Sequence, residues 1–218
     1  MTVKLIWITP DAEKLIVEMA RVSNPTSASK GANPERLIRY LKDHQHWSPF
    51  EMASACFEID TTRDIARQIL RHRSFSFQEF SQRYASPEVL PEVDPRECRM
   101  QDTKNRQSSL ACDSTNIGYE WSLRQLDVIG LAERHYQWAL KAGIAKEVAR
   151  AVLPEGLTPS RMYMAGTFRS WLHYCDLRCD DSTQKEHRMI AEDILRNLIA
   201  YAPNIFKPDI KEEWLDAF

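Results

Sequence analysis

No run of apolar residues in this 218-residue sequence approaches the roughly 20 that a membrane-spanning helix needs. The apolar start, residues 3–8, is short and is followed at once by a helix signal, so we expect no secretory leader. The five cysteines are scattered and include no CxxC pair, which argues against a disulfide framework or a zinc knuckle. We therefore expect a reduced, cytoplasmic protein that does not enter a membrane.

The sequence also lacks a strong net charge, which is −2 at neutral pH. No bulk field therefore favours nucleic acid or an anionic membrane, and any anion site has to be local. Lysine is locally absent as well: none occurs between Asp43 and Thr103, while the same stretch holds seven arginines. Arginine is the side chain that recognises phosphate and carboxylate groups with two parallel hydrogen bonds, so this bias marks a candidate anion site.

The order of apolar patterns and caps predicts an α+β fold over residues 1–218, as one domain with a central, mostly antiparallel sheet flanked by long helices. Strands are expected from alternating or β-branched residues, and helices from caps such as Thr9-Pro10, Asn33-Pro34 and the capping boxes Thr61–Asp64 and Thr183–Glu186. The predicted strands cover 3–8, 52–59 and 161–165, and the predicted helices cover 9–22, 33–44, 61–72, 120–142, 146–152, 167–178 and 183–201.

Residues 86–118 form a long stretch without a helical or strand pattern. Three prolines and a polar run from Gln101 to Ser109 predict an irregular excursion there. Its length motivates the hypothesis that it covers a site when substrates bind. Protease sensitivity that stays equal with and without ligands would count against that hypothesis.

Three of the arginines, Arg63, Arg67 and Arg71, are spaced by four residues and share one face of the predicted helix. They could bind an anion or pair with nearby acids such as Asp60 and Asp64 on a solvated surface, and spacing alone favours neither interpretation. Ser81 and Arg83 follow in a predicted extended stretch, where alternate side chains point the same way and Glu79 shares their side. A hydroxyl and a guanidinium on one side suit a phosphate.

These residues also carry a resemblance. Arg71-His72-Arg73, followed after seven residues by Ser81, is similar to the motif of the flavin-dependent thymidylate synthases, and the surrounding residues 78–84 resemble that family too. Further similar segments follow the family's order along residues 20–190: 20–23, 44–51, 146–154, and Arg169 with Leu177-Arg178. Four fixed positions with the trailing Ser-x-Arg make this match far more specific than a lone RHR. The sequence departs from the common pattern at Ser48, Thr167 and His173, and in the spacing between Pro154 and Arg161.

The resemblance implies an enzyme that makes dTMP from dUMP with FAD as cofactor, and with NADPH and methylenetetrahydrofolate as co-substrates. It implies a dUMP site made of Gln68, Arg71, Glu79, Ser81, Arg83, Arg150 and Arg178. It implies an FAD site made of Ser23, Ser48, Glu51, Arg71, His72, Arg73, Glu79, Arg169 and His173. Arg178 would lie against the uracil, where its fixed charge stabilises negative charge on the ring. Catalytic roles fall on Arg178, His46 and Ser81, with His46 near the flavin and the folate and Ser81 as a substrate ligand.

The resemblance further implies a homotetramer whose active sites are shared between subunits. It also motivates the hypothesis that reduced flavin, and not a cysteine thiolate, mediates carbon transfer, since no cysteine lies near the arginine motif in sequence. The nearest, Cys56, falls inside a predicted strand. Loss of turnover in folded protein after all five cysteines are replaced by serine would refute this hypothesis.

Three other interpretations stay open at this level. His44 and His46 with Glu51 could chelate a metal, but no further ligand has zinc-site spacing, so we expect none. An RNA-binding module could use the arginines on phosphates and stack bases on Phe75, Phe77 and Phe80, although a pI near 6.3 argues against it. A nucleotide-binding enzyme of another reaction type is the third, and flavin content would weigh against it.

Overall fold

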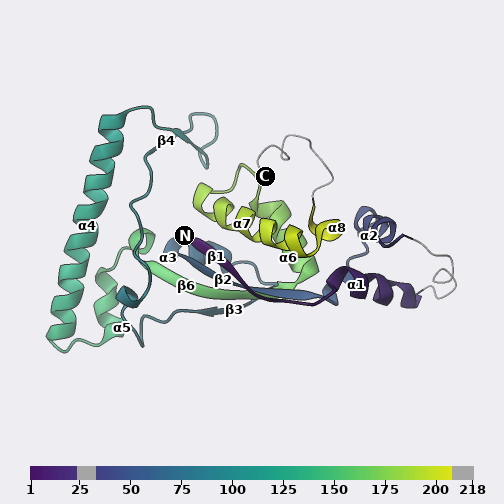
Figure 1. The fold of residues 1–218 in the computed structure, drawn as a ribbon. Coiled ribbons are helices and arrows are strands. Elements are labelled where there is room, and N and C mark those ends of the chain that lie inside the picture. Colours follow the sequence, from purple (N-terminus) through teal and green to yellow (C-terminus); the bar gives the residue numbers. More distant parts are fainter. Residues whose placement is uncertain (24–32, 208–218) are drawn as a thin grey trace.

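The computed structural model describes residues 1–23 and 33–207 (Figure 1). Its centre is a four-stranded antiparallel sheet in the order β1-β2-β6-β3. The strands are β1 (Thr2–Ile8), β2 (Ser54–Thr62), β6 (Pro159–Thr167) and β3 (Ser76–Glu79). This confirms the predicted α+β class with an antiparallel sheet. A separate two-stranded hairpin consists of β4 (Arg99–Gln101) and β5 (Ser109–Ala111).

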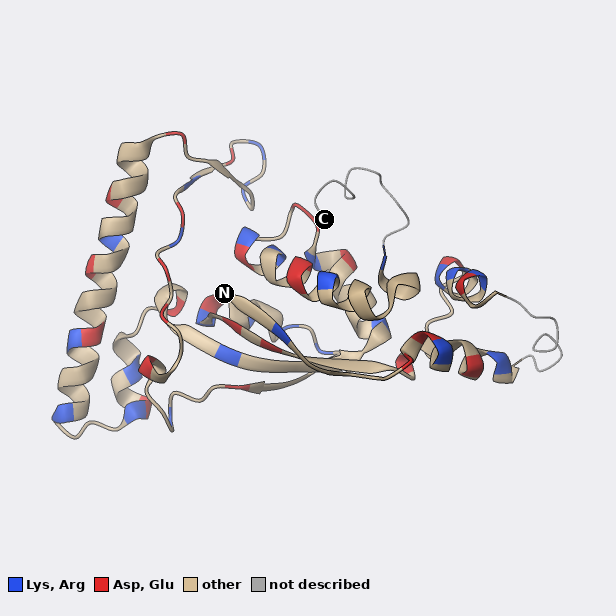
Figure 2. Cartoon of the chain, in the orientation of Figure 1, with Lys and Arg blue, Asp and Glu red and all other residues tan. Residues whose placement is uncertain are grey.

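Helices surround the sheet unevenly. In Figure 1, α6 and α7 lie over one of its faces, α1 and α2 lie near one end of the strands, and α4 stands apart. Both signs of charge occur on α1, α4 and α7 in Figure 2, in keeping with the small net charge. The helices are α1 (Ala12–Ala20), α2 (Pro34–Asp43), α3 (Arg63–Ile69), α4 (Thr115–Lys141), α5 (Lys146–Ala149), α6 (Phe168–Arg178), α7 (Lys185–Tyr201) and α8 (Pro203–Phe206).

The main core lies between the sheet and the helices α3, α6 and α7. The predicted alternation is confirmed, because Ala53, Ala55, Phe57 and Ile59 are all buried. Trp171 of α6 is fully buried; its ring centroid lies 5.1 Å from that of Phe57 and its indole N–H donates to the Ala55 carbonyl over 3.3 Å. Burying side chains of this size supplies most of the stabilisation of such a domain, so the body of the protein is anchored here.

Gly166 makes room for part of this core. A Cβ atom at Gly166 would lie 2.4 Å from the ring of Phe75, closer than any real carbon contact. Phe75 thereby reaches Trp171, with ring centroids 4.5 Å apart, and also contacts the rings of His72 and Tyr174. A glycine in β6 thus sets the position of the segment that follows α3.

A second, smaller core joins α4 to α5. Tyr136, Ala139 and Ala149 are buried there. Gly143 has φ +82°, a left-handed conformation that favours glycine, and it lies just beyond α4 as the sequence predicted. Along the rest of α4, large apolar side chains stay exposed: Ile117, Tyr119, Trp121, Leu123, Leu126, Val128, Leu131 and Trp138. We call α4, α5 and the following 3₁₀ helix Arg150–Val152 the arm.

Three predicted helix starts are wrong, and at two of them the threonine side chain bonds elsewhere. Thr9 exchanges hydrogen bonds with the backbone of Ser54, and α1 begins later, after Asp11. Thr62, not Thr61, precedes α3, and no side-chain cap forms there. Thr183 donates to the Leu177 carbonyl, so no capping box starts α7. The caps at Asn33 before α2 and Thr167 before α6 are confirmed.

The 86–118 stretch is more regular than predicted. It contains the β4–β5 hairpin and the first turn of α4, whose N-cap is the Ser114 side chain. Residues 91–98, by contrast, carry no helix or strand. Among the described residues, no helix combines the length and apolarity needed to cross a membrane.

Candidate functional site

The arginine face of α3 divides into paired and free residues. Arg63 lies 3.5 Å from Glu79, and Arg67 forms an ion pair with Glu155, so these two follow the surface-pairing interpretation. Arg71 lies in the turn after α3 and is exposed, and its side chain has no partner among the residues that the structure describes. Arg71 is therefore the guanidinium of this face that remains available to an external anion.

His72 and Arg178, which are 106 positions apart in the sequence, meet at the end of α6. The Arg178 Nε–H donates to His72 Nε2 over 2.9 Å. Burial and the charge of Arg178 lower the pKa of His72 to about 4, so its ring is neutral and can accept this bond. The bond fixes one edge of the Arg178 guanidinium and leaves its other N–H groups for a ligand.

Gln68 joins this pair through two residues that the sequence did not single out. His187 of α7 is fully buried; its Nδ1 lies 3.3 Å from Gln68 Oε1 and its Nε2 lies 3.1 Å from the Tyr174 hydroxyl. The ring of Tyr174 in turn packs against His72, with centroids 4.9 Å apart. His187 is not among the candidate residues that the sequence predicted. No local pattern marks it, since its partners come from α3 and α6.

Glu79, at the end of β3, is bound to neighbouring side chains. Its Oε1 accepts from the Ser160 hydroxyl over 2.8 Å and lies 3.5 Å from Arg63. The extended stretch stops there: Ser81 begins a turn in which its carbonyl accepts from the amides of Tyr84 and Ala85. The predicted strand alternation of Glu79, Ser81 and Arg83 is therefore wrong beyond Glu79.

That turn connects the body to the arm. The Arg83 amide donates to Ser81 Oγ over 3.4 Å, and the Arg83 guanidinium lies 3.1 Å from Glu147 of α5. Arg150, one residue after α5, has no ion pair within the described part of the chain. The Gln82 side chain is buried, yet its Nε2 has no partner among the described residues. An unpaired buried amide is costly, so this turn lacks a polar partner in the isolated chain.

A second group of predicted residues lies at the other end of α6. Arg169 forms an ion pair with Glu51, the last residue of the 3₁₀ helix Ser48–Glu51. Ser48, the first residue of that helix, is exposed. The ring centroid of His173 lies 4.7 Å from that of Trp47. The exposed ring of His46 lies 5.9 Å from Tyr40, which stacks on His44. Ser23, at the end of the 3₁₀ turn after α1, donates to the Ala20 carbonyl.

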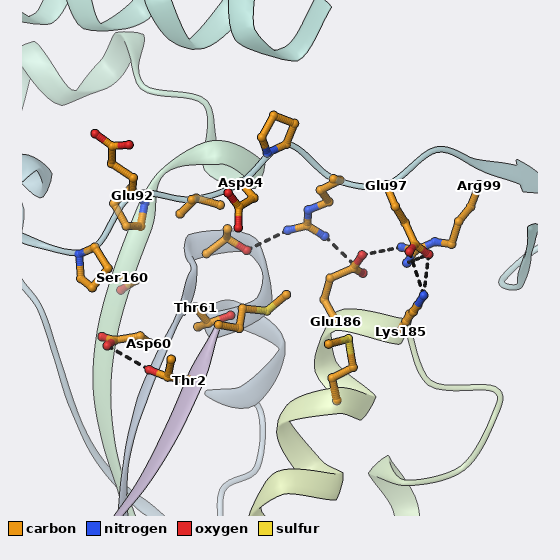
Figure 3. A pocket seen from close by; sticks show the side chains of 18 residues that line it. Thr2, Asp60, Thr61, Glu92, Asp94, Glu97, Arg99, Ser160, Lys185 and Glu186 are labelled. Carbon is orange, nitrogen blue, oxygen red and sulfur yellow. Dashed lines mark hydrogen bonds and ion pairs between the residues drawn. The ribbon is translucent and has the colours of Figure 1, made fainter. Parts of the chain in front are cut away.

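The structure therefore gathers the predicted residues into separate groups. Arg169 and Arg178 are nine positions apart on α6, which corresponds to roughly 13 Å along a helix. A cavity of about 420 Å³ lies elsewhere, between the strand ends near Thr2 and Asp60 and the segment 91–99 (Figure 3). That cavity contains none of the predicted site residues.

With this geometry in place, comparison with known proteins decides the family. The model of the family described as "Thymidylate synthase complementing protein" matches residues 4–204. The chain belongs to this family. It is 43% identical over 214 residues to a "Probable flavin-dependent thymidylate synthase" of Paramecium bursaria Chlorella virus 1, covering 95% of this chain and 98% of the relative. It is 48% identical over 179 residues to the "Flavin-dependent thymidylate synthase" of Synechocystis, covering 82% and 80%.

A solved structure outside these relatives shares the fold of the thymidylate synthase complementing protein family. It is the UMP/dUMP methylase PolB from Streptomyces cacaoi bound with 5-Br dUMP, with a TM-score of 0.82 and 29% identity. The match covers 100% of this chain and 95% of that chain. The motif resemblance, the family match and the structural likeness therefore agree.

The cysteines of this family member lie closer to the site than their sequence positions suggested. Cys175 on α6 and Cys179, the residue directly after Arg178 at the end of α6, are both buried. The neighbouring Cys179 and burial raise the pKa of Cys175, and burial raises that of Cys56, so neither thiol favours the thiolate that a nucleophile needs. Within the described residues, no group of three or more His, Cys, Asp or Glu side chains is arranged to hold a metal ion.

Proposed function

We propose that this chain catalyses the reductive methylation of dUMP to dTMP with bound FAD, using methylenetetrahydrofolate as carbon donor and NADPH as reductant. The observation that carries the proposal is the Arg178–His72 pair beside the free Arg71, in a chain whose relatives are named flavin-dependent thymidylate synthases. The printed function of PolB, a UMP/dUMP methylase, supports the same substrate class.

We assign the binding of the dUMP phosphate and sugar to residues around the Ser81 turn. Arg71 and Arg150 carry guanidinium groups with no partner in the described chain, and a planar pair of N–H donors matches a phosphate. Arg83 is paired with the exposed Glu147, a contact worth little in water and readily exchanged for a phosphate. Ser81, Gln68 and Glu79 complete the proposed substrate contacts.

Arg178 is the residue assigned to the base. His72 holds its Nε edge, so the remaining N–H donors keep one orientation without a competing acid. A fixed cation in that place stabilises negative charge as carbon 5 of the uracil becomes nucleophilic. Carbon 5 gains a methyl group in the overall reaction and releases its hydrogen as a proton.

The residues assigned to FAD fit a dianionic diphosphate bonded to ribityl and ring groups. Arg73 is exposed with no partner among the described residues, Arg169 and Glu51 offer a donor and an acceptor, and His173 and Ser48 lie nearby in the same helical region. Ser23 and the neutral His72 complete the predicted set. Bound FAD would supply the redox chemistry of the reaction, and His46 is assigned to the folate side.

The RNA-binding alternative receives no support from the comparisons. One of its three stacking residues, Phe75, is buried in the core against Trp171 and is not free to stack on a base. This part of the alternative is therefore wrong.

A homotetramer with shared sites remains part of the proposal. The exposed apolar residues of α4 would be covered by other copies of the chain, as expected for an assembly interface. The unpaired Gln82 amide beside Ser81 and Arg83 is consistent with a turn that another subunit or a ligand completes. The cytoplasmic location predicted from the sequence likewise stays within the proposal.

Tritium release from dUMP labelled at carbon 5 tests the reaction directly. With methylenetetrahydrofolate present, release that requires both FAD and NADPH is the expected result. Release without flavin would point to a different mechanism, and no release from folded, flavin-loaded protein would refute the proposed function.

A further inference from the structure

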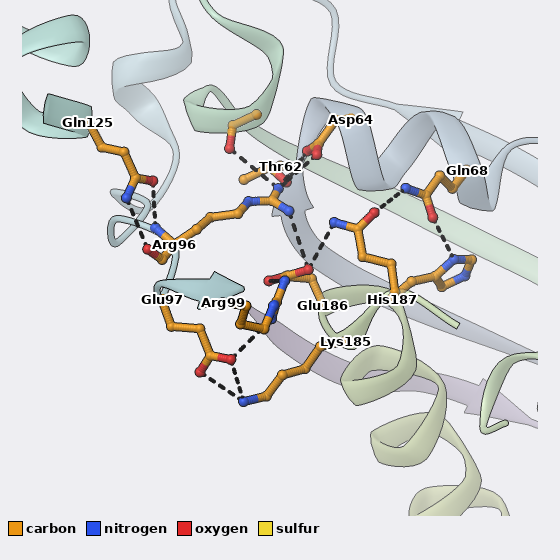
Figure 4. A network of polar contacts seen from close by, with 12 residues as sticks. Thr62, Asp64, Gln68, Arg96, Glu97, Arg99, Gln125, Lys185, Glu186 and His187 are labelled. Atoms are coloured by element: carbon orange, nitrogen blue, oxygen red, sulfur yellow. Dashed lines mark hydrogen bonds and ion pairs between the residues drawn. The ribbon is translucent and has the colours of Figure 1, made fainter. Parts of the chain in front are cut away.

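A chain of hydrogen bonds includes Gln68, one of the proposed dUMP ligands, and part of it is drawn in Figure 4. Gln184 Nε2 donates to Glu186 Oε2 over 2.9 Å, and Gln68 Nε2 donates to Gln184 Oε1 over 2.8 Å. Gln68 Oε1 contacts His187 Nδ1, and His187 Nε2 contacts the Tyr174 hydroxyl. The chain therefore connects α7, α3 and α6, and Gln68 is the member that the proposed function assigns to the nucleotide.

The chemistry of one end sets the direction of every bond. An ionised carboxylate only accepts, so Gln184 has to turn its amide NH₂ to Glu186 and its oxygen to Gln68. Gln68 must then turn its NH₂ to Gln184 and its oxygen to His187. His187 must carry its proton on Nδ1, which leaves Nε2 to accept from Tyr174. With Glu186 ionised, this is the arrangement that satisfies all these contacts.

Glu186 is held in the ionised state by two arginines. Its side chain is 7% exposed; Arg99 Nη2 lies 2.6 Å from Oε1 and Arg96 Nη1 lies 3.4 Å from Oε2. Hydrogen bonds from Gln184 and Arg99 outweigh burial and lower the pKa of Glu186. Arg96 is itself bound to Asp64 and to the carbonyl of Gly156. Arginines of the segment 91–99 therefore stabilise the ionised carboxylate of Glu186, at which the chain of hydrogen bonds begins.

The other end of the chain requires a neutral histidine. Burial and the charge of Arg178 lower the pKa of His187 to about 3. The ring thus keeps one donor and one acceptor, as the order of the bonds demands.

We infer that Glu186, Gln184 and His187 are positioning residues that fix the amide of Gln68, so that its second N–H is presented to dUMP. Of the two amide protons on Gln68, one goes to Gln184, and the other has no partner among the described residues. Without this chain of hydrogen bonds, the side-chain amide of Gln68 could rotate and present its oxygen to dUMP. That oxygen would repel a phosphate or carbonyl oxygen of the nucleotide. This inference rests on the proposed function, because it takes Gln68 to be a dUMP ligand.

The test compares two carboxylates that share an arginine. Glu186→Gln keeps the shape of the side chain but allows Gln184, and with it Gln68, to turn over. Glu97→Gln is the matched control. Glu97 also binds Arg99, together with Lys185, but it is not a member of the chain of hydrogen bonds that leads to Gln68. Binding of dUMP to the FAD-loaded protein, and binding of FAD to the full chain freed of FAD, would be measured separately by titration calorimetry.

We expect Glu186→Gln to weaken dUMP binding roughly five-fold, the equivalent of one neutral hydrogen bond, with FAD affinity unchanged. Glu97→Gln should leave both affinities within about two-fold. Equal weakening by both variants, or by neither, would overturn the inference. A wild-type protein that binds no dUMP would refute the proposed function as well, which is a distinguishable result.

A second pair of variants guards against a folding defect at Glu186. Gln184→Met removes the acceptor for Gln68 at nearly constant volume and should weaken dUMP binding by a similar factor. Gln184→Glu combined with Glu186→Gln exchanges the two groups, so that position 186 donates to a carboxylate at 184 and Gln68 must again turn its NH₂ to position 184; this double variant should recover most of the affinity. Failure of the double variant to bind dUMP more tightly than Gln184→Met would show that packing, not the direction of the hydrogen bonds, determines the affinity.

Discussion

The body and the arm of this protein contain similar helices with opposite surroundings. In the body, α6 packs Phe168, Trp171 and Tyr174 into a core that they share with the sheet. In the arm, the 27 residues of α4 include only four that are buried, and its large apolar side chains face outward. Exposed apolar side chains along a helix favour association, and for this reason the proposed function assigns the arm, and not the body, to an interface between subunits.

The proposed site divides along the same line. Gln68, His72 and Arg178 belong to the body, whereas Arg150 belongs to the arm, and the Ser81 turn lies between them through Arg83 and Glu147. Stability and site assembly can therefore be disturbed separately, and three experiments use this separation.

The largest expected effect comes from a tryptophan in each region. Trp171→Ala should lower the free energy of unfolding by about 3–5 kcal/mol, because a fully buried indole leaves a cavity. Trp138 on α4 is 64% exposed, and Trp138→Ala should change protomer unfolding by less than about 1 kcal/mol. Urea unfolding at fixed protein concentration measures both. Similar losses in the two variants would show that α4 is part of the folding unit.

The next effect concerns the divided site. Arg178→Met and Arg150→Met should each lower kcat/KM by about 10²–10³, since each removes a fixed positive charge from the substrate. If the two arginines serve one site from different subunits, dissociating and reassociating a mixture of the variants should restore about a quarter of the sites. Tritium release from the mixture measures the recovery. No recovery in a verified mixed oligomer would place both arginines in the same subunit.

The smallest effect is a pH dependence of stability. His72 and His187 have pKa values of about 4 and about 3 in the folded protein, against 6.5 for a free histidine. As pH falls below 6.5, the unfolded chain takes up protons that the folded chain does not, so stability is present above 6.5 and is lost toward pH 4. We expect the free energy of unfolding to fall steadily between pH 6.5 and pH 4, with the fully buried His187 contributing more of the loss than the partly exposed His72.

The control for this dependence lies in the arm. His187→Gln should flatten the decline between pH 6.5 and 4, while His135→Gln, at an exposed position on α4, should leave it unchanged. Unfolding midpoints measured across that range would decide. An identical slope in wild type and His187→Gln would exclude His187 as a source of the acid sensitivity.

The sequence predicted the elements whose signals are local. The alternation around Ala53 and Phe57 placed β2, and Asn33-Pro34 and Thr167 placed α2 and α6, because period and capping depend on neighbouring residues. The helix caps predicted at Thr9 and Thr183 are wrong. A threonine hydroxyl can donate to any nearby carbonyl, and these two donate to the carbonyls of Ser54 and Leu177. The β4–β5 hairpin has no alternation of buried and exposed residues to reveal it.

The candidate site followed the same rule. The Arg71–Ser81 motif was visible because its members are close in sequence, and it led to the correct family. His187 was missed because its importance lies in contacts to Gln68 and Tyr174 across the fold. The pairing of Arg63 and Arg67 with acids could not be read from spacing, since Glu79 and Glu155 reach them from other elements.

The need for glycine at position 166 also limits which substitutions the protein can accept. Any larger residue there would displace Phe75, whose ring contacts both Trp171 and His72. A change near the end of β6 would thus be transmitted to His72, the residue that binds Arg178. Positions 75 and 166 should consequently vary together, with a smaller ring or aliphatic group at 75 accompanying any side chain at 166. Single-site libraries would score Gly166 as intolerant, while paired libraries would recover allowed combinations.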